Sequence, residues 1–429
     1  MWTPVTDSAT LLLLLVACFD SATGYHSLYR LKAESHQQAD ALSHFTRRSR
    51  LDCVDTWKEP GPTSRDAVVA VSSQCLGLLR NLTSSEGIQA TRITDDIESI
   101  VKKEQQQRVH RRRRSQSADY TFDEYHSYAD MLSHLGVLSS RYPDRARTVQ
   151  YGSSREGRPM VALALGRPQA PSGGLTGKPA FWMDSCVHAR EWLSCAVHIA
   201  LIDKLVTEYE TNETVRQMVD GVDFYLVPVG NPDGYEYSRV EADFEHRFWR
   251  KNRFSNGCSP VEQYTESYRG RTPFSEPESA AIRDYAQRIP NLRAFITLHT
   301  FGETLMFGTT EPGEPPPDNL DEMRRVGETA SEGIEAVRGH KYRVGLVEEL
   351  LYPISGDSPN WAVKMGVPFA YTMELGPNDP EAEQRTPHFL GDFAITMGFL
   401  ADEAEIAPAV EEVFAAVRVI SEEIMQQPP

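Results

Sequence analysis

The residues best suited to chemistry lie in one short run, Asp184-Ser185-Cys186-Val187-His188-Ala189-Arg190-Glu191-Trp192. His188 and Glu191 are three residues apart, so one helical turn can aim an imidazole and a carboxylate at a common point. A zinc ion takes such nitrogen and oxygen ligands, with a third ligand from elsewhere and one position left for water. The pair alone is weak evidence, because an ordinary helical surface contact has the same spacing.

Two further polar residues stand at the ends of apolar runs. His299 follows the run 294–298, and Glu374 ends the run 370–373. A histidine in that position is more often a core side chain with satisfied hydrogen bonds. A carboxylate, however, is costly to bury without a cation or hydrogen-bond donors. Several strand-end polar residues in one sheet therefore favour a functional site, with His299 as the candidate third ligand.

The elements that would position these residues alternate between strands and helices. Asn231-Pro232-Asp233-Gly234 is expected to be a turn, and Ser275-Glu276-Pro277-Glu278 to open a helix as a capping box. Strands separated by helical segments predict an α/β sheet with helices on both faces. The pattern indicates strands at 179–183, 222–229, 295–298 and 369–373, and helices at 192–209 and 406–424.

The N-terminus indicates export. The 429 residues are 40% apolar and 24% charged, which is ordinary globular composition. No apolar run approaches the roughly 20 residues of a membrane-spanning helix. The longest run, 11–19, has the length of a signal-peptide core and is followed by small residues. We therefore expect a signal peptide at 1–24 and a secreted, extracellular protein, although the run could instead begin a buried helix.

A boundary is indicated by the basic run Arg111-Arg112-Arg113-Arg114. Up to Arg114 the chain has 16 Lys and Arg against 13 Asp and Glu, so the remainder has 28 against 48, a net charge of −20. That acidity argues against nucleic-acid or membrane partners. The run could be a solvated or nuclear-targeting stretch. In an exported chain the run predicts a cleavage site for an activating protease that cuts after basic residues. The cut would separate a small α+β propeptide domain (25–114) from a peptidase domain (115–429).

At these motifs the chain resembles the zinc carboxypeptidases of the pancreatic A/B type, with their activation segment. The resemblance covers nearly the whole chain and rests on residues 188–192, Leu298-His299-Thr300 and Thr372-Met373-Glu374-Leu375. It implies a mixed central sheet with helices on both faces, one Zn²⁺ held by His188, Glu191 and His299, and Glu374 as the catalytic carboxylate. The implied activity is removal of single residues from the C-termini of peptides or proteins.

Further matches imply substrate-facing groups. Phe248-Trp249-Arg250-Lys251-Asn252-Arg253 is similar to the family's Trp-Arg-Lys-x-Arg segment, and we assign its last arginine, Arg253, to the oxyanion. Tyr352 would cap the substrate, Arg190 would line outer subsites, and Phe399 would lie at the pocket rim. In the N-terminal segment, Trp57-Lys58-Glu59-Pro60 resembles the activation-domain motif.

The pocket for the C-terminal side chain is mostly apolar by the same resemblance. Pro359 stands at the floor position where B-type enzymes carry Asp, so an A-like preference for apolar or aromatic residues is favoured; Asp357 keeps a basic preference open. The implied pocket positions are Met306, Val347, Leu351, Ile354, Pro359 and Thr372.

The chain departs from the family at one loop. The family's Asp-x-Asn-Arg-Asn run, which clamps the substrate's terminal carboxylate, is absent from the 14 residues between Arg253 and Tyr268. The alternative function is therefore a catalytically impaired pseudoenzyme or peptide-binding protein.

The pairing of the cysteines also stays open, because Cys53 and Cys75 could form a disulfide or remain buried thiols. The remaining mature cysteines form an odd set: Cys186, Cys195 and Cys258.

Overall fold

The computed structural model describes residues 25–48, 53–62, 65–114, 120–166, 178–253, 270, 272–308, 316–351, 354, 356–376 and 398–427, with the backbone alone at 111–114. The expected signal peptide, residues 1–24, lies outside these ranges. Within them, no helix is both long enough and apolar enough to cross a membrane.

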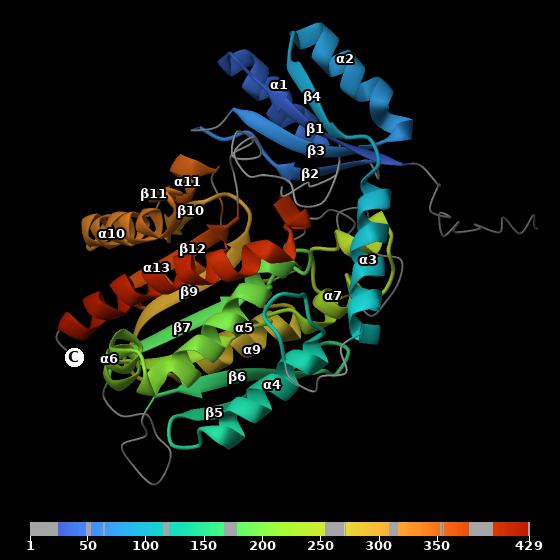
Figure 1. Ribbon diagram of the computed structural model, residues 1–429. Coiled ribbons are helices and arrows are strands. Elements are labelled where there is room, and N and C mark those ends of the chain that lie inside the picture. The colour runs from blue at the N-terminus through green and yellow to red at the C-terminus, as the bar shows by residue number, and fades with distance from the viewer. Residues whose placement is uncertain are drawn as a thin grey trace, which may run out of the picture.

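The N-terminal part of the chain has a sheet of its own, coloured blue in Figure 1. Its strand order is β2-β3-β1-β4, and neighbouring strands are antiparallel. A disulfide joins Cys53, which precedes β2, to Cys75, which precedes α2. The elements are β1 (His26–Lys32), α1 (His36–Arg48), β2 (Val54–Lys58), β3 (Asp66–Ser72), α2 (Leu76–Glu86), β4 (Gln89–Thr94) and α3 (Ile97–Arg114).

The larger unit contains an eight-stranded sheet of order β11-β10-β12-β9-β7-β8-β6-β5. Its four central strands, from β12 to β8, are parallel to one another, and antiparallel pairs lie on both sides of them. The strands are β5 (Ala146–Ser153), β6 (Pro159–Leu165), β7 (Ala180–Ser185), β8 (Asp223–Val227), β9 (Leu292–Thr300), β10 (Thr304–Phe307), β11 (Arg343–Leu346) and β12 (Phe369–Leu375).

Helices cover both faces of this sheet because the strands are apolar on both sides. In β7, Phe181 and Met183 join one buried cluster, while Ala180 and Trp182 join the other. The first cluster includes α4 (Tyr128–Arg141), α5 (Trp192–Thr207), α6 (Glu213–Gly221), α10 (Leu320–Arg338) and α13 (Ile406–Gln426). The second includes α9 (Pro277–Ala286) and α12 (Ser358–Lys364). The predicted fold class, a mixed sheet with helices on both faces preceded by a small α+β unit, is confirmed.

Shorter elements connect these layers. They are α7 (Pro232–Tyr237), α8 (Phe244–Arg247) and α11 (Val347–Leu350), with 3₁₀ turns at Ser73–Cys75, Glu208–Glu210, Gly398–Leu400 and Glu403–Glu405. Figure 1 shows α3 descending from the small sheet along the side of the larger unit.

Two local predictions need correction. The segment 231–234 is the start of α7 rather than a free turn, because the Asn231 side chain accepts a hydrogen bond from the Gly234 amide and caps the helix. The capping box expected at 275–278 does not form, since α9 begins with Glu276 as its N-cap and without a side-chain cap hydrogen bond. Pro277 in the first turn presets the helical φ angle and needs no amide partner there.

Candidate active site

The candidate site lies at the carboxyl ends of three neighbouring parallel strands, β7, β9 and β12 (Figure 1). His188 lies in the connection that follows β7, and Glu191 is the N-cap residue of α5. His299 is the second-last residue of β9, and Glu374 is directly opposite it in the register of β12. Because the carboxyl ends of parallel strands meet at one edge, three segments far apart in sequence deliver their polar ends to one place.

The three predicted ligands converge. Nδ1 of His188 lies 2.7 Å from Oε1 of Glu191, and Nδ1 of His299 lies 3.0 Å from Oε2 of the same carboxylate. The two Nδ1 atoms are 3.0 Å apart, and all the donor atoms fall within 4.8 Å of one another. Two imidazole nitrogens and a carboxylate around one point are the donors that zinc takes in a catalytic site. These residues therefore fit the ion.

A contact on the side of the ring away from the ligand cluster sets the orientation of His299. Its Nε2 lies 3.0 Å from Oγ1 of Thr297, two residues earlier on the same face of β9. When Nε2–H donates to that hydroxyl oxygen, Nδ1 keeps a free lone pair that points at the ligand cluster. Sequence reasoning missed Thr297, although the two-residue period of a strand could have indicated it.

Electrostatics also suits a cation at this point. Burial alone would raise the pKa of Glu191, but the facing imidazoles of His188 and His299 lower it well below its usual range. Burial and the charge of Arg250 lower the pKa of His188 to about 3, so its ring is neutral at pH 7. Burial opposes ionisation of His299, yet the Glu191 carboxylate raises its pKa. The negative charge of Glu191 thus favours a cation at the point where the three donor groups meet.

Glu374 lies beside this cluster without being part of it. Burial raises its pKa to about 8, while the charge on His299 opposes that rise. Among the described residues its Oε2 has no hydrogen-bond partner, which is unusual for a buried oxygen. A bound dication nearby would lower the pKa of this carboxyl and leave an ionised oxygen free to accept a proton.

Three arginines at a spacing of three residues take three different positions. Buried Arg247 pairs with Glu104 of α3, with Nε 2.7 Å from the carboxylate. Arg250 places its Nη1 3.4 Å from Oε1 of Glu191, at the ligand cluster. Arg253 stacks over the Tyr237 ring, and its Nε lies 3.6 Å from Glu156.

The oxyanion role of Arg253 stays a prediction. None of the contacts that Arg253 makes with the described residues involves the ligand cluster, and the arginine at the cluster is Arg250. Arg250 and Arg253 belong to the same motif, and the directions of their side chains in the loop after α8 distinguish them.

Two predicted substrate-facing residues lie together and are covered by the N-terminal segment. The guanidinium of Arg190 lies 4.1 Å from the centre of the Phe399 ring, and Arg190 is only 3% exposed. Its Nη1 is 3.1 Å from a carboxylate oxygen of Asp55 in β2. The Trp57 ring, from the same strand, lies 5.3 Å from Phe399. Sequence reasoning marked Trp57 but missed Asp55.

Most of the predicted pocket positions also come together. Met306, Val347, Leu351 and Ile354 belong to one small apolar cluster. Thr372 pairs with Met306 across β10 and β12, and a Cβ added at Gly308 would meet the backbone of Pro359, which is itself buried. Tyr352, the predicted cap, lies outside the described residues.

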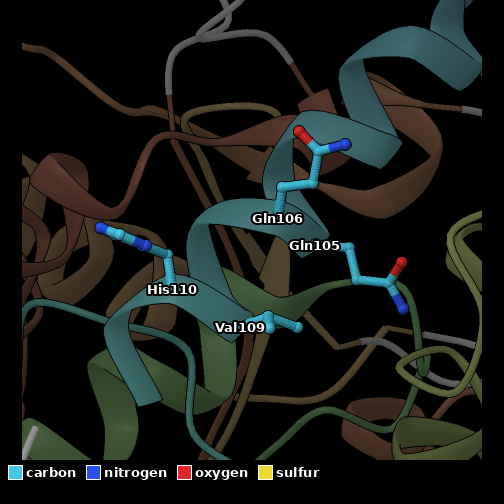
Figure 2. Close-up of a pocket in the computed structure, with 4 residues that line it drawn as sticks. All are labelled: Gln105, Gln106, Val109 and His110. Atoms are coloured by element: carbon cyan, nitrogen blue, oxygen red, sulfur yellow. The ribbon is translucent and has the colours of Figure 1, made fainter. Parts of the chain in front are cut away.

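A separate hollow of about 270 Å³ lies on α3, lined by Gln105, Gln106, Val109 and His110. Figure 2 shows their side chains pointing in different directions from the helix. They do not converge on a ligand, and none of the predicted site residues lines this hollow.

A comparison with known protein families decides to which family the chain belongs. Residues 131–416 match the model of the zinc carboxypeptidase family. The chain belongs to that family. It is a metallocarboxypeptidase whose cofactor is zinc, as the sequence predicts, and the cluster of His188, Glu191 and His299 is suited to hold one ion.

Relatives and solved structures agree with this membership. The chain is 27% identical over 419 residues to carboxypeptidase A4 of Mus musculus, covering 92% of this chain and 93% of the relative. It is 27% identical over 422 residues to carboxypeptidase A2 of Rattus norvegicus, covering 94% and 91%. The crystal structure of carboxypeptidase A from Helicoverpa armigera superposes with a TM-score of 0.79 at 24% identity, covering 94% of this chain and 98% of that one. At that identity the superposition supports the fold alone.

Removal of one ligand should empty the zinc site of this carboxypeptidase. Metal analysis of the purified full chain should find about one zinc ion per molecule, and His299→Ala should lose most of it. His134→Ala, which changes a histidine paired with Asp203 away from the site, is the control and should retain zinc. Because Glu191 raises the pKa of His299, protons compete with the metal and zinc retention should fall as the pH is lowered. Undiminished zinc in His299→Ala would refute the ligand set.

Proposed function

We propose that the protein is a secreted zymogen of a zinc carboxypeptidase that removes single amino acids from peptide C-termini, with an A-like preference for apolar or aromatic residues. The observation that carries this proposal is the convergence of His188, Glu191 and His299 beside an oxygen of Glu374 that has no hydrogen-bond partner among the described residues. An acid–base group next to a metal-binding cluster is the arrangement that peptide hydrolysis by a metal-activated water requires.

Each side chain has a role in this proposal. A bound zinc ion would supply a Lewis acid that acidifies water and polarises a carbonyl group. Glu374 accepts the proton of the attacking water on its free oxygen and donates it to the leaving amine. Arg250 lies near the cluster and is proposed to place a positive charge where the oxyanion develops. Arg253, for which the family resemblance implies this role, is the alternative.

The N-terminal segment acts as an inhibitory cover in this proposal. Asp55 carries a carboxylate to Arg190, a predicted substrate-binding group, and Trp57 packs against Phe399 at the predicted rim. A peptide that needs Arg190 must displace this ion pair. Residues 25–114 would therefore be a propeptide, and the arginines at 111–114, where α3 ends, the place at which an activating protease acts.

Cleavage should accompany the appearance of activity. Exposure of the full chain to a basic-specific protease should give a new N-terminus near Ser115 and release of C-terminal Phe from a test peptide. A variant with all four residues 111–114 changed to Gln should remain uncut there and show little activity. N-terminal sequencing and the peptide assay measure both results; full activity of the uncut variant would contradict the propeptide assignment.

Specificity is proposed from the apolar cluster around Met306 and Val347, with Pro359 close by. None of these side chains offers a charge to a basic residue, so peptides ending in Phe or Leu are the favoured substrates. Lys- and Arg-terminated peptides are the comparison in the same assay.

The absent Asp-x-Asn-Arg-Asn run sets a further expectation. A lost bidentate clamp removes charge-assisted hydrogen bonds of roughly 1.5 to 3 kcal/mol each. The activated enzyme should therefore discriminate poorly between a peptide with a free C-terminal carboxylate and its C-terminal amide. Insertion of an Asp-x-Asn-Arg-Asn loop between Arg253 and Tyr268 should restore preference for the free acid. Strong rejection of the amide by the unaltered enzyme would show that another cation binds the carboxylate, and no turnover with zinc bound would favour the pseudoenzyme.

A further inference from the structure

Two cysteines flank the metal-binding segment and face each other. Cys186 directly follows β7, and Cys195 lies in the first turns of α5. Their Sγ atoms are 2.7 Å apart, and both side chains are fully buried. That separation is shorter than a van der Waals contact between sulfur atoms and approaches the length of about 2.05 Å of a disulfide bond.

The backbone already holds both cysteines in place. Cys186 has a φ angle of 52°, in the left-handed region that a residue with a Cβ seldom occupies because of steric strain. Its amide donates to Oγ of Ser194, one residue before Cys195, and its carbonyl accepts from the Asn231 amide. The strained residue is thus fixed with its sulfur against its neighbour, so a bond between the two requires little backbone movement.

The reduced pair, by contrast, makes weak contacts. Sγ of Cys195 lies 3.2 Å from the Trp192 carbonyl oxygen, and Sγ of Cys186 lies 3.8 Å from that of Glu191. A thiol is a poor hydrogen-bond donor, so these contacts do little to favour two free thiols at so short a separation.

We propose that Cys186 and Cys195 form a disulfide that closes the segment carrying His188, Arg190 and Glu191. The oxidant is a disulfide of the folding compartment, such as glutathione disulfide. One cysteine thiolate attacks it to give a mixed disulfide and one released thiol. The second thiolate then displaces the remaining thiol, so two protein thiols are oxidised as one disulfide is reduced to two thiols. The Cys53–Cys75 disulfide of the same chain requires the same oxidising conditions.

The bond must form before the core closes. Neither cysteine side chain is exposed once the chain has folded. No small disulfide can then reach either thiol. After formation, the same burial protects the bond from reduction.

The disulfide would stiffen the metal-binding segment. Eight residues separate the two cysteines, and they include two of the three ligands. Without the bond, those ligands are held by hydrogen bonds such as that from the Glu191 amide to the His188 carbonyl oxygen. A covalent closure reduces the alternative conformations available when the metal is absent, so it favours the bound state.

A tryptic map of the unaltered full chain tests the bond directly. The protein is folded in a glutathione redox buffer, free thiols are blocked under denaturing conditions, and digestion follows without reduction. Because trypsin cuts after Arg190, the bond should link peptide 156–190 to peptide 191–204, and reduction should separate them. Blocked thiols on both peptides, or a link from either one to the peptide 254–269 that carries Cys258, would overturn the proposal.

The role of the bond is tested with zinc rather than activity. Cys186→Ala with Cys195→Ala keeps apolar side chains in the buried site, and zinc retention against a chelator should fall about tenfold, the lower end of the effect of removing a group that orients metal ligands. Cys258→Ala is the control and should leave both the linked peptides and the zinc unchanged. Equal zinc retention in the double variant would overturn the role of the bond, and the map of the unaltered chain still decides its existence if the variant fails to fold.

Discussion

Glu374→Gln should lower the turnover of the activated enzyme by roughly two to four orders of magnitude, the range over which a positioned acid–base group accelerates a reaction. Its zinc content should be unchanged. The amide keeps the shape of the side chain but cannot accept a proton from water. Zinc should remain, because the three donor atoms that converge belong to His188, Glu191 and His299.

The control for this substitution is Glu349→Gln, which removes a half-exposed carboxylate paired with Arg324. It should retain both turnover and zinc.

The pH profile separates a catalytic role of Glu374 from a structural one. A general base works only when ionised, so the activity of the parent enzyme should fall as the pH drops through the pKa of Glu374. That pKa is about 8 without metal and lower beside a bound dication. A Gln variant that keeps full activity with the same acidic limb would contradict the assignment.

The fold could be predicted from the sequence because its signals are local. The apolar runs at 295–298 and 369–373 lie within β9 and β12, and the terminal amphipathic segment is α13. Element ends were less certain, since they depend on capping contacts. The α9 start, for example, depends on Pro277 rather than on the expected capping box.

The ligand cluster could be predicted from the sequence because each ligand follows or ends a strand, and parallel strands bring such ends together. The positions of side chains that depend on the direction of a loop could not be predicted. Arg247 directly precedes the motif that contains Arg250 and Arg253, yet the three side chains point toward α3, the ligand cluster and Glu156. The contact of Asp55 with Arg190 could not be predicted either, because two residues 135 positions apart leave no local pattern in the sequence.

The two arginines therefore give a direct comparison. Arg250→Gln should lower kcat/KM by roughly a hundredfold to a thousandfold, the usual loss when one group that stabilises an oxyanion is removed. Arg253→Gln should change kcat/KM only slightly, because its contacts are with Glu156 and the rings of Tyr237 and Trp249. Both variants remove one positive charge from neighbouring positions of the same loop, so a general electrostatic effect on an acidic protein would lower both alike.

Zinc content must be measured in both proteins, because Arg250 also acts on a ligand. Its charge helps to lower the pKa of His188, so its removal raises that pKa and strengthens proton competition for the metal at low pH. At pH 7.5 the ring remains neutral and zinc should be retained, which leaves loss of turnover as the effect of the missing charge. Arg250→Lys, which restores the charge without the planar fork, should recover part of the rate. If Arg253→Gln is the impaired variant and Arg250→Gln is not, the guanidinium of Arg253 must reach the site in the activated enzyme, and the sequence motif was a better guide than the contacts of the full chain.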